Sequence, residues 1–384
     1  MTAFPLNSEI SAANQLHAKL EHLSARRVFL VTGKESFFAS KAAETIATAC
    51  DNLITNRFCD FAANPERTDV NLGIAQCTAF SPDVIVAIGG GSVIDMAKLI
   101  SAAMSSVRDD INDILLIDKI SREIPLIAVP TTAGSGSEAT QFAVLYIEKT
   151  KHSVDAPALL PDYSILDSRL TLSASSFQSA VSGIDALCQS IESFWSVQST
   201  TQSRKFSTRA IELILANIGR SVNQADPDAR RQMLTAAHLA GQAINITRTT
   251  GPHALSYILT SAFGVPHGQA VALSVVPFFN FNADYNNHKL NDPRGHNHLQ
   301  TTFKTLVKLF NITQPADFSK KFHALLTSIG LQSSLRQLGI EGEKAIQLIA
   351  DNVNLERLKN NPVTISSTDI HQIISAMLDN PYFD

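Results

Sequence analysis

The sequence has few cysteines and almost no net charge. Its 384 residues include four cysteines, Cys50, Cys59, Cys77 and Cys188, which lie far apart and form no CxxC pair. This usage excludes a dense disulfide framework and predicts a reducing, cytoplasmic compartment. Lysine and arginine number 31 against 35 aspartates and glutamates, which gives a formal net charge of -4. A near balance argues against a nucleic-acid binder, for which a basic excess is typical.

Long apolar runs are also missing. No uninterrupted apolar stretch approaches the roughly 18 residues that a membrane helix needs. The first nine residues lack the basic and apolar regions of a secretory signal. Hydrophobic residues still make up 45% of the chain and charged residues 17%, which is enough apolar material for a sizeable core. We therefore expect a soluble, enzyme-sized protein of two or three domains without nucleic-acid or membrane partners.

The first 170 or so residues alternate between short β-branched runs and helical stretches. Buried strands are expected at residues 27–32, 83–88 and 124–129, and helices at 41–53 and 92–104. This alternation predicts an α/β domain with a mostly parallel sheet and right-handed crossovers.

Beyond Leu172 the pattern becomes helical. Helix-period segments cover residues 176–196, 200–223, 226–247, 299–311 and 368–379, with Ser173 and Asp226 where N-caps are expected. We predict an α/β domain over residues 1–172 and an all-helical domain over residues 173–384, with the boundary near residues 168–176. A cleft between two such domains is a common place for a small-molecule site. The segment 282–298 is rich in Asn, Asp and His, and its composition predicts an exposed loop.

A glycine-rich turn separates a predicted strand from a predicted helix. Gly89, Gly90, Gly91 and Ser92 occupy the turn, and Asp95 and Lys98 lie one turn apart on the helix that follows. Glycines allow the backbone to approach an anion closely, and a helix N-terminus supplies free N–H groups, so a pyrophosphate is the expected ligand. The alternative is a tight βα turn without a ligand.

A second glycine motif is weaker. Residues 134–139 match the G-x-G-x-x-A dinucleotide expression, but Pro130, Thr131, Thr132 and Ala133 separate them from the preceding strand. No acidic residue ends a strand about 20 residues further on. We expect a polar loop here.

Four polar side chains have the spacing of a metal site. Asp185 and Gln189 are four residues apart and project from one helical face. His253 and His267 follow, each next to a proline. Together they can surround a divalent ion. The alternative is that the histidines are packed in the core and that Asp185 is a capping or paired acid.

These motifs together resemble one known family. Residues 89–98 are similar to a GGGSxxDxAK signature, residues 130–138 to PTTAGTGSE, residues 183–187 to GxDAL, and His253 to His267 to H-x13-H with PHG. The chain is identified on these motifs as a member of the iron-containing (group III) alcohol dehydrogenase family, in order over nearly its whole length. The resemblance implies a dehydroquinate synthase-like fold and hydride transfer between NAD(P)H and an alcohol/aldehyde pair. It also implies a divalent metal (Fe2+ or Zn2+) and a homodimer.

The resemblance assigns roles by position. Gly89, Gly90, Gly91, Ser92 and Asp95 match the pyrophosphate turn, while Thr131, Thr132, Ser135 and Lys151 match positions around the cofactor. Asp185, His253 and His267 match three of four metal ligands.

Two positions depart from the family pattern near the metal. Gln189 replaces the family's histidine, and an amide oxygen is a weaker donor than imidazole, so we expect lower metal affinity or another metal preference. Tyr257 stands where many members carry a further histidine. A phenol can still donate a proton to a developing alkoxide.

The cofactor preference follows from the end of the first strand. Many NAD-preferring members place there an aspartate that binds the ribose 2′-OH, whereas this chain has Gly33 and Lys34. Without the acid a 2′-phosphate is not repelled, and Lys34 can attract it. We expect NADP(H) to be favoured, with NAD(H) as the alternative; an ordinary turn with an exposed lysine gives the same sequence.

Arg248 indicates the substrate. It lies five residues before His253, where relatives often carry small or neutral residues, and a guanidinium can clamp a phosphonate or carboxylate. The alternative is that Arg248 is an ordinary surface or ion-paired arginine. Residues 185–195 and 249–257 resemble the phosphonoacetaldehyde reductase branch, which implies reduction to 2-hydroxyethylphosphonate. Alternatives are a general alcohol, diol or polyol dehydrogenase, a dehydroquinate-synthase-like lyase and a non-catalytic nucleotide-binding relative. Cys188 is expected to be a packing residue rather than a nucleophile.

Overall fold

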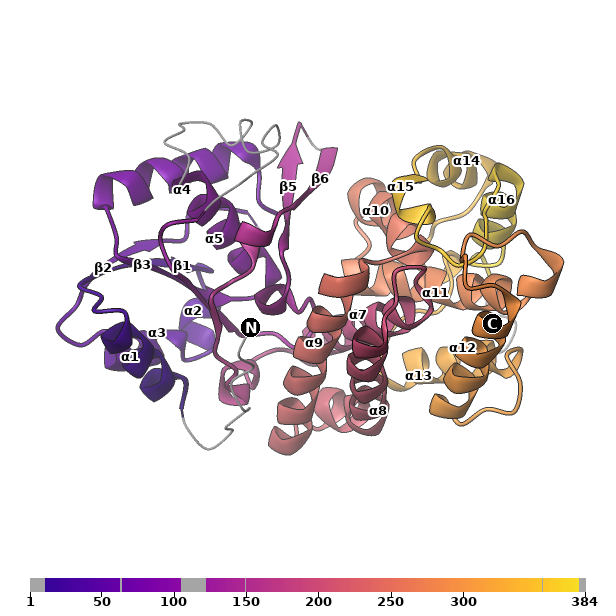
Figure 1. Cartoon of the computed structure of the whole chain (residues 1–384), viewed down its shortest axis with the longest axis horizontal. Helices are drawn as coiled ribbons and strands as arrows, with labels where there is room; N and C mark the ends of the chain where they lie inside the picture. The colour runs from indigo at the N-terminus through magenta and orange to yellow at the C-terminus, as the bar shows by residue number, and fades with distance from the viewer. Residues whose placement is uncertain (1–10, 63, 105–121, 149, 354, 380–384) are drawn as a thin grey trace. The chain divides into compact units, whose positions relative to one another are not determined.

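The computed structural model describes residues 11–62, 64–104, 122–148, 150–353 and 355–379. The chain forms two compact units, Met1–Ala174 and Ser175–Asp384 (Figure 1). No helix in these described ranges is both long and apolar enough to cross a membrane.

A parallel five-stranded sheet is the centre of the first unit. Its spatial order is β2-β1-β3-β4-β7, and every neighbouring pair is parallel. The strands are β1 (Arg27–Thr32), β2 (Ile54–Phe58), β3 (Val84–Gly89), β4 (Leu126–Pro130) and β7 (Tyr163–Ser164). The predicted α/β class is confirmed.

Helices cover both faces of this sheet (Figure 1). Side chains alternate along a strand, so Phe29 and Val31 pack under α4 (Arg67–Phe80) and α5 (Gly91–Met104). Val28 and Leu30 pack on the opposite face, under α1 (Ala12–His22) and α3 (Ala42–Ala49). All six residues of β3 are buried, which explains its continuous apolar sequence.

Several elements of this unit were not anticipated from the sequence, including helices α1 and α4 and the short strand β7. Strand β2 lies at the edge of the sheet, a short helix α2 (Ser36–Ala39) follows β1, and β5 (Phe142–Ile147) pairs antiparallel with β6 (Thr150–Asp155) in a separate hairpin. The G-x-G-x-x-A segment forms a loop that ends in the 3-10 helix η1 (Ser137–Ala139). The prediction of a loop rather than a dinucleotide turn there is confirmed.

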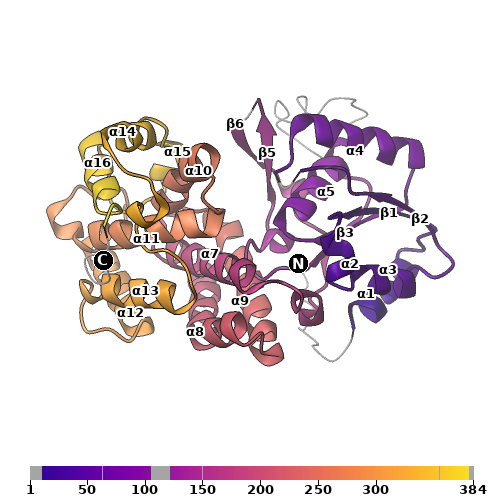
Figure 2. The ribbon, with the colours of Figure 1, turned by 180° about the vertical axis from the view of Figure 1, so that it is seen from behind.

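The second unit is built from helices (Figure 2). In its described residues the only β pairing is an isolated bridge between Leu290 and Val363. The helices are α7 (Ser176–Trp195), α8 (Thr201–Asn223), α9 (Pro227–Thr247), α10 (Gly251–Phe263), α11 (His267–Ala283), α12 (His296–Leu309), α13 (Asp317–Ser328), α14 (Glu343–Asp351), α15 (Leu355–Leu358) and α16 (Ser367–Ser375). The predicted helical character of this half is confirmed.

One of the two predicted helix caps is correct. The Asp226 side chain accepts a hydrogen bond from Ala229 N and caps α9. Helix α7 is capped by Ser175, which accepts from Gln178 N, and not by Ser173. Both serines have the right chemistry, and only the start of the helical backbone distinguishes them.

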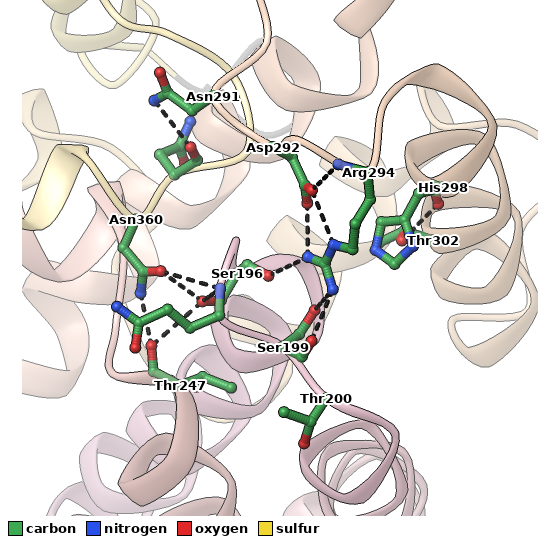
Figure 3. A network of polar contacts seen from close by, with 12 residues as sticks. Ser196, Ser199, Thr200, Thr247, Asn291, Asp292, Arg294, His298, Thr302 and Asn360 are labelled. Carbon is green, nitrogen blue, oxygen red and sulfur yellow. Dashed lines mark hydrogen bonds and ion pairs between the residues drawn. The ribbon is translucent and has the colours of Figure 1, made fainter.

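The expectation of an exposed loop over residues 282–298 is correct in part. Most of this segment connects α11 to α12, and eight of its 17 residues are exposed, but some of its polar side chains are buried. Asn282 lies in α11 and is fully buried, and Asp292 is 3% exposed. Arg294 donates to both carboxylate oxygens of Asp292, at 2.8 and 2.6 Å, and to the carbonyl of Ser196 at 2.9 Å (Figure 3). Polar composition predicted exposure, but polar groups can be buried when each finds a partner.

Asn360 connects this network to the ends of two long helices. Its amide nitrogen donates to the carbonyl of Thr247 at 2.7 Å, and its oxygen accepts from Ser196 Oγ at 2.8 Å (Figure 3). The same nitrogen donates to the carbonyl of Thr249 at 3.0 Å. Ser196 follows α7, and Thr247 ends α9. The contacts fix the short connection between α9 and α10, which leads directly to His253.

Candidate metal centre and dinucleotide turn

Three of the predicted metal ligands meet in the second unit. Asp185 on α7, His253 on α10 and His267 at the start of α11 each offer one ligand atom, and these atoms lie within 4.8 Å of one another. No other cluster of three or more His, Cys, Asp or Glu side chains of this kind occurs among the residues described. The imidazole rings of His253 and His267 are edge to face, with centroids 5.3 Å apart.

A glycine allows α11 to approach α7 closely enough to form this group. A Cβ atom on Gly268 would lie 2.0 Å from the carbonyl oxygen of Val181 and 3.0 Å from Asp185 Cβ. Any larger residue at this position would push the two helices apart. The glycine of the PHG segment therefore brings the neighbouring His267 next to Asp185.

Glu192 orients His253, a role that was not predicted from the sequence. The Glu192 carboxylate is fully buried one helical turn beyond Gln189, and its Oε1 forms a short hydrogen bond with His253 Nδ1. The other ring nitrogen, Nε2, lies 3.5 Å from Asp185 Oδ1. A carboxylate on one imidazole nitrogen fixes the ring and directs the other nitrogen toward a metal. The i+7 spacing from Asp185 along one helix was the available signal.

The second oxygen of Glu192 accepts from the turn before α10. Oε2 lies 2.7 Å from the backbone nitrogen of Thr250 and 3.0 Å from its Oγ1. The Trp195 indole nitrogen donates to the same hydroxyl oxygen at 2.9 Å. Both oxygens of Glu192 are thus committed as acceptors.

The charges at this group favour a cation. Burial lowers the pKa of His253, but the negative charge of Glu192 and the hydrogen bonds with Asp185 and Glu192 outweigh it and raise the pKa to about 9. A site that stabilises positive charge on imidazole has the electrostatics that a divalent ion requires. With one carboxylate and two imidazoles, the donor set suits iron or zinc.

Gln189 lies at the same place. Its amide nitrogen donates to Asp185 Oδ2 at 3.1 Å, and the side chain is buried. The structure thus brings the fourth predicted residue to the group, with its amide nitrogen directed at the second oxygen of Asp185.

Tyr257 contacts both His267 of this group and the cationic side chain of Arg357. Its ring stacks on His267 with centroids 6.3 Å apart, and its hydroxyl oxygen accepts a hydrogen bond from Arg357 on α15. Burial raises the pKa of Tyr257, and the positive charge of Arg357 partly offsets this. Arg357 was not identified from the sequence, because nothing in residues 343–358 indicates that α15 packs on α10.

Arg248 contacts the end of the helix that precedes it. It follows the last residue of α9 with a φ of 60°, and its Nη1 donates to the carbonyl of Asn245 at 2.5 Å. A guanidinium at a helix C-terminus interacts favourably with the helix dipole, so this contact has a structural function of its own. A substrate role for Arg248 stays a prediction.

Cys188 behaves as a packing residue. It is completely buried, and burial together with the Glu192 charge raises the pKa of its thiol well above the usual value. A thiol with a raised pKa is a poor nucleophile.

In the first unit the glycine turn meets the Thr-rich loop. The backbone nitrogen of Thr131 donates to the carbonyl of Gly89 at 3.0 Å, and Gly89 pairs with Pro130 in the sheet. A Cβ on Gly91 would lie 2.7 Å from Ser135 Oγ. The two motifs therefore form one surface at the N-terminus of α5, which is the geometry that suits a pyrophosphate.

Asp95 and Lys98 form hydrogen bonds with the loop that contributes to this surface. Asp95 accepts from Ser137 Oγ at 2.5 Å and from Val144 N at 3.0 Å. The fully buried Lys98 donates to Ser137 Oγ at 2.9 Å and Thr140 Oγ1 at 3.0 Å, and burial lowers its pKa to about 8. The Asp95 carboxylate thus faces protein donors on the loop and on β5, and its predicted contact with the cofactor stays a prediction.

The remaining predicted cofactor residues lie apart from one another. Gly33 and Lys34 directly follow β1, and Lys34 Nζ forms an exposed ion pair with Asp60 at 2.6 Å. Lys151 lies on β6, where it pairs with Tyr146.

Comparison with models of known protein families identifies the family of this chain. The model of the iron-containing alcohol dehydrogenase domain matches residues 7–168, and that of the C-terminal domain of the same family matches residues 179–378. The chain belongs to the iron-containing alcohol dehydrogenase family. It is an oxidoreductase acting on alcohols and aldehydes, in a family that uses a nicotinamide dinucleotide and a divalent metal.

Individual relatives differ in substrate. Phosphonoacetaldehyde reductase of Streptomyces viridochromogenes is 30% identical over 78% of this chain and 77% of its own. Long-chain-alcohol dehydrogenase 1 of Geobacillus thermodenitrificans is 27% identical, covering 97% of this chain and 95% of its own. The structure of sulfoacetaldehyde reductase from Bifidobacterium kashiwanohense in complex with NAD+ aligns with a TM-score of 0.85 and 27% identity, over 96% and 95% of the two chains.

Proposed function

We propose that the protein reduces an aldehyde that carries an anionic group, of the phosphonoacetaldehyde kind, to the corresponding alcohol with NADPH. The observation that carries this is the guanidinium of Arg357 on the hydroxyl of Tyr257, whose ring stacks on His267 of the metal-type group. An aldehyde held at that group would place a phosphonate or sulfonate one or two bonds from its carbonyl, within reach of a cation. Two similar proteins are named for substrates of this type.

We assign Asp185, His253 and His267 as the metal ligands, with Gln189 as a fourth donor. The ion, when bound, supplies Lewis-acid polarisation of the substrate carbonyl. Glu192 holds His253 in the ligating tautomer. Tyr257 keeps its hydroxyl proton and donates it to the alkoxide oxygen as hydride is delivered.

We assign the surface of Gly89, Gly90, Gly91 and Ser92, with Thr131, Thr132 and Ser135, to the dinucleotide pyrophosphate, and Lys151 and Asp95 to its surroundings. Gly33, which brings no acid to the ribose, supports NADPH over NADH. A homodimer in a reducing cytoplasm stays a prediction.

A substrate panel tests the proposal. Phosphonoacetaldehyde, sulfoacetaldehyde, succinic semialdehyde and propanal are each assayed with NADPH and NADH on wild type, Arg357→Ala and Arg248→Ala. We expect Arg357→Ala to raise KM for the anionic aldehydes at least about tenfold, because a charge-assisted hydrogen bond is lost, with little change for propanal. An unchanged ratio of anionic to neutral turnover in both variants would contradict the proposal.

The second candidate is a dehydrogenase for neutral alcohols. The similarity to a long-chain-alcohol dehydrogenase over almost the whole chain favours it. The same panel identifies it by a preference for propanal and longer neutral aldehydes over the charged ones.

A further inference from the structure

Arg57 lies at the carboxyl end of β2, next to the turn that follows β1. It is opposite Leu30 in the pairing of these two strands. Its Nε donates to Thr32 Oγ1 at 2.7 Å, and its Nη2 donates to the carbonyls of Gly33 and Lys34 at 2.8 and 3.1 Å. The guanidinium is therefore fixed on the turn from which the acidic residue is missing.

Aromatic rings hold the same guanidinium from the side. Its central carbon lies 4.4 Å from the centroid of Phe37 and 5.2 Å from that of Phe38. Such contacts restrict a guanidinium without neutralising it. Within the described part of the chain no carboxylate forms an ion pair with Arg57, and its Nη1 has no hydrogen-bond partner there. Arg57 is thus a positioned cation whose charge is not compensated by the protein.

Lys34, the cation predicted from the sequence, is in the opposite situation. Its ammonium is 2.6 Å from Asp60, and the hydrogen bond and charge of that carboxylate raise the pKa of Lys34. Both side chains are mostly exposed. A phosphate approaching Lys34 would also meet the negative charge of Asp60, so the ion pair offers little net attraction.

The sheet order places Arg57 where an adenosine ribose would lie. Strand β1 lies between β3, which ends at the glycine turn, and β2, which ends near Arg57. Two strand spacings amount to about 10 Å. The ribose that carries the 2′ position is next to the pyrophosphate in the cofactor, so it would lie over the end of β1, at Gly33.

We propose that Arg57 binds the 2′-phosphate of NADP(H), and that the turn Thr32–Lys34 holds its guanidinium in place for this purpose. The inference rests on the proposed function insofar as the glycine turn binds a nicotinamide dinucleotide. The free Nη1 group of a positioned guanidinium suits a phosphate oxygen, to which it donates a charge-assisted hydrogen bond.

Binding of adenosine fragments tests the assignment without metal or substrate. Adenosine 2′,5′-bisphosphate and 5′-AMP are titrated calorimetrically into the full-length protein and into Arg57→Gln, Arg57→Lys and Lys34→Gln. Arg26→Gln is the matched control, because Arg26 is exposed at the opposite, amino end of β1. NADPH and NADH are then titrated in the same way.

We expect Arg57→Gln to weaken the bisphosphate about tenfold to a hundredfold, as for loss of a hydrogen-bonded charge pair, and 5′-AMP less than about threefold. Arg57→Lys keeps the charge and should lose an intermediate amount of affinity for the bisphosphate. This variant also tests the proposal if Arg57→Gln is poorly folded. Lys34→Gln and Arg26→Gln should change the ratio little.

Equal losses of both ligands in Arg57→Gln and Arg57→Lys would overturn the inference, because they would show that Arg57 only supports the turn. A larger effect of Lys34→Gln would overturn it in favour of the lysine. If the wild-type protein binds 5′-AMP but gains nothing from the 2′-phosphate, the inference fails while the dinucleotide site stands. If it binds neither fragment and neither dinucleotide, the proposed function itself fails.

Discussion

Replacing Glu192 by glutamine tests how the metal group is organised. Glutamine has almost the same shape but only one acceptor oxygen, whereas both oxygens of Glu192 accept hydrogen bonds. If the amide oxygen faces Thr250, the NH2 group faces His253 Nδ1, which must then give up its proton and carry it on Nε2. That tautomer has no lone pair on Nε2, the nitrogen that faces Asp185, with which to ligate a metal. If the amide is reversed, the buried N–H and hydroxyl of Thr250 lose their acceptor.

Either arrangement has a cost that can be estimated. Leaving a buried donor unsatisfied costs about 1–3 kcal/mol, and loss of a carboxylate partner to a ligating histidine lowers metal affinity about 10–100-fold. We therefore expect Glu192→Gln to bind Zn2+ or Fe2+ about 10–100-fold more weakly, with dinucleotide binding unchanged.

The assay is competition for metal against a chelator of known affinity, followed by metal analysis of the protein. The control is Glu212→Gln, because Glu212 is an exposed residue of α8 whose only described ion pair is with Arg209. Metal affinity in Glu192→Gln that equals wild type would refute the reasoning, because the contacts of Glu192 with His253 would then have no bearing on ligation.

Three further substitutions have defined outcomes. Gly33→Asp should lower NADPH affinity about a hundredfold, since juxtaposed like charges cost several kcal/mol. The control Gly33→Ala meets the same Ser36 hydroxyl without the charge and should keep the affinity of the wild type. Equal NADPH affinities of the two variants would contradict this prediction. Gln189→His should raise zinc affinity about tenfold or more by supplying an imidazole. Chelator competition measures this affinity, and a value equal to that of the wild type would contradict the prediction. Burial opposes ionisation of Asp292, but Arg294 outweighs it and lowers the pKa, so Asp292→Asn should cost about 3 kcal/mol in urea unfolding at pH 7. Because the native pKa is depressed, this difference should persist above the unfolded pKa of about 4 and disappear as the pH falls through the native one; a difference that grows in acid would be the wrong sign.

The sequence carries the fold through local patterns. The β-branched run at β3 and the glycines that follow it are sufficient to predict a buried strand and a turn at a helix N-terminus, because both properties depend on neighbouring residues. Strand β2 has an irregular burial pattern at the sheet edge, and its sequence therefore lacks the period that would identify it.

The site residues also fall into two groups: those that local sequence patterns identify and those that only packing brings together. Asp185 and Gln189 are recognisable because a helix places them on one face. His253 and His267 were candidates from the sequence, and the motif resemblance assigned them as ligands. Arg357 and Arg57 escaped because each acquires its position through packing between segments distant in sequence: α15 against α10 in one unit, and β2 beside β1 in the other. The buried Asp292 network was misjudged for the converse reason, because composition records polarity but not the partners that permit burial.

Removal and return of the metal tests the central claim most directly. Protein stripped by a chelator, and shown by elemental analysis to be free of iron and zinc, is assayed for NADPH-dependent reduction of phosphonoacetaldehyde before and after Fe2+ or Zn2+ is added. We predict that activity is lost, that the ion restores it in wild type, and that His267→Ala does not recover while still binding NADPH. Undiminished aldehyde reduction by the metal-free wild-type protein would contradict the account.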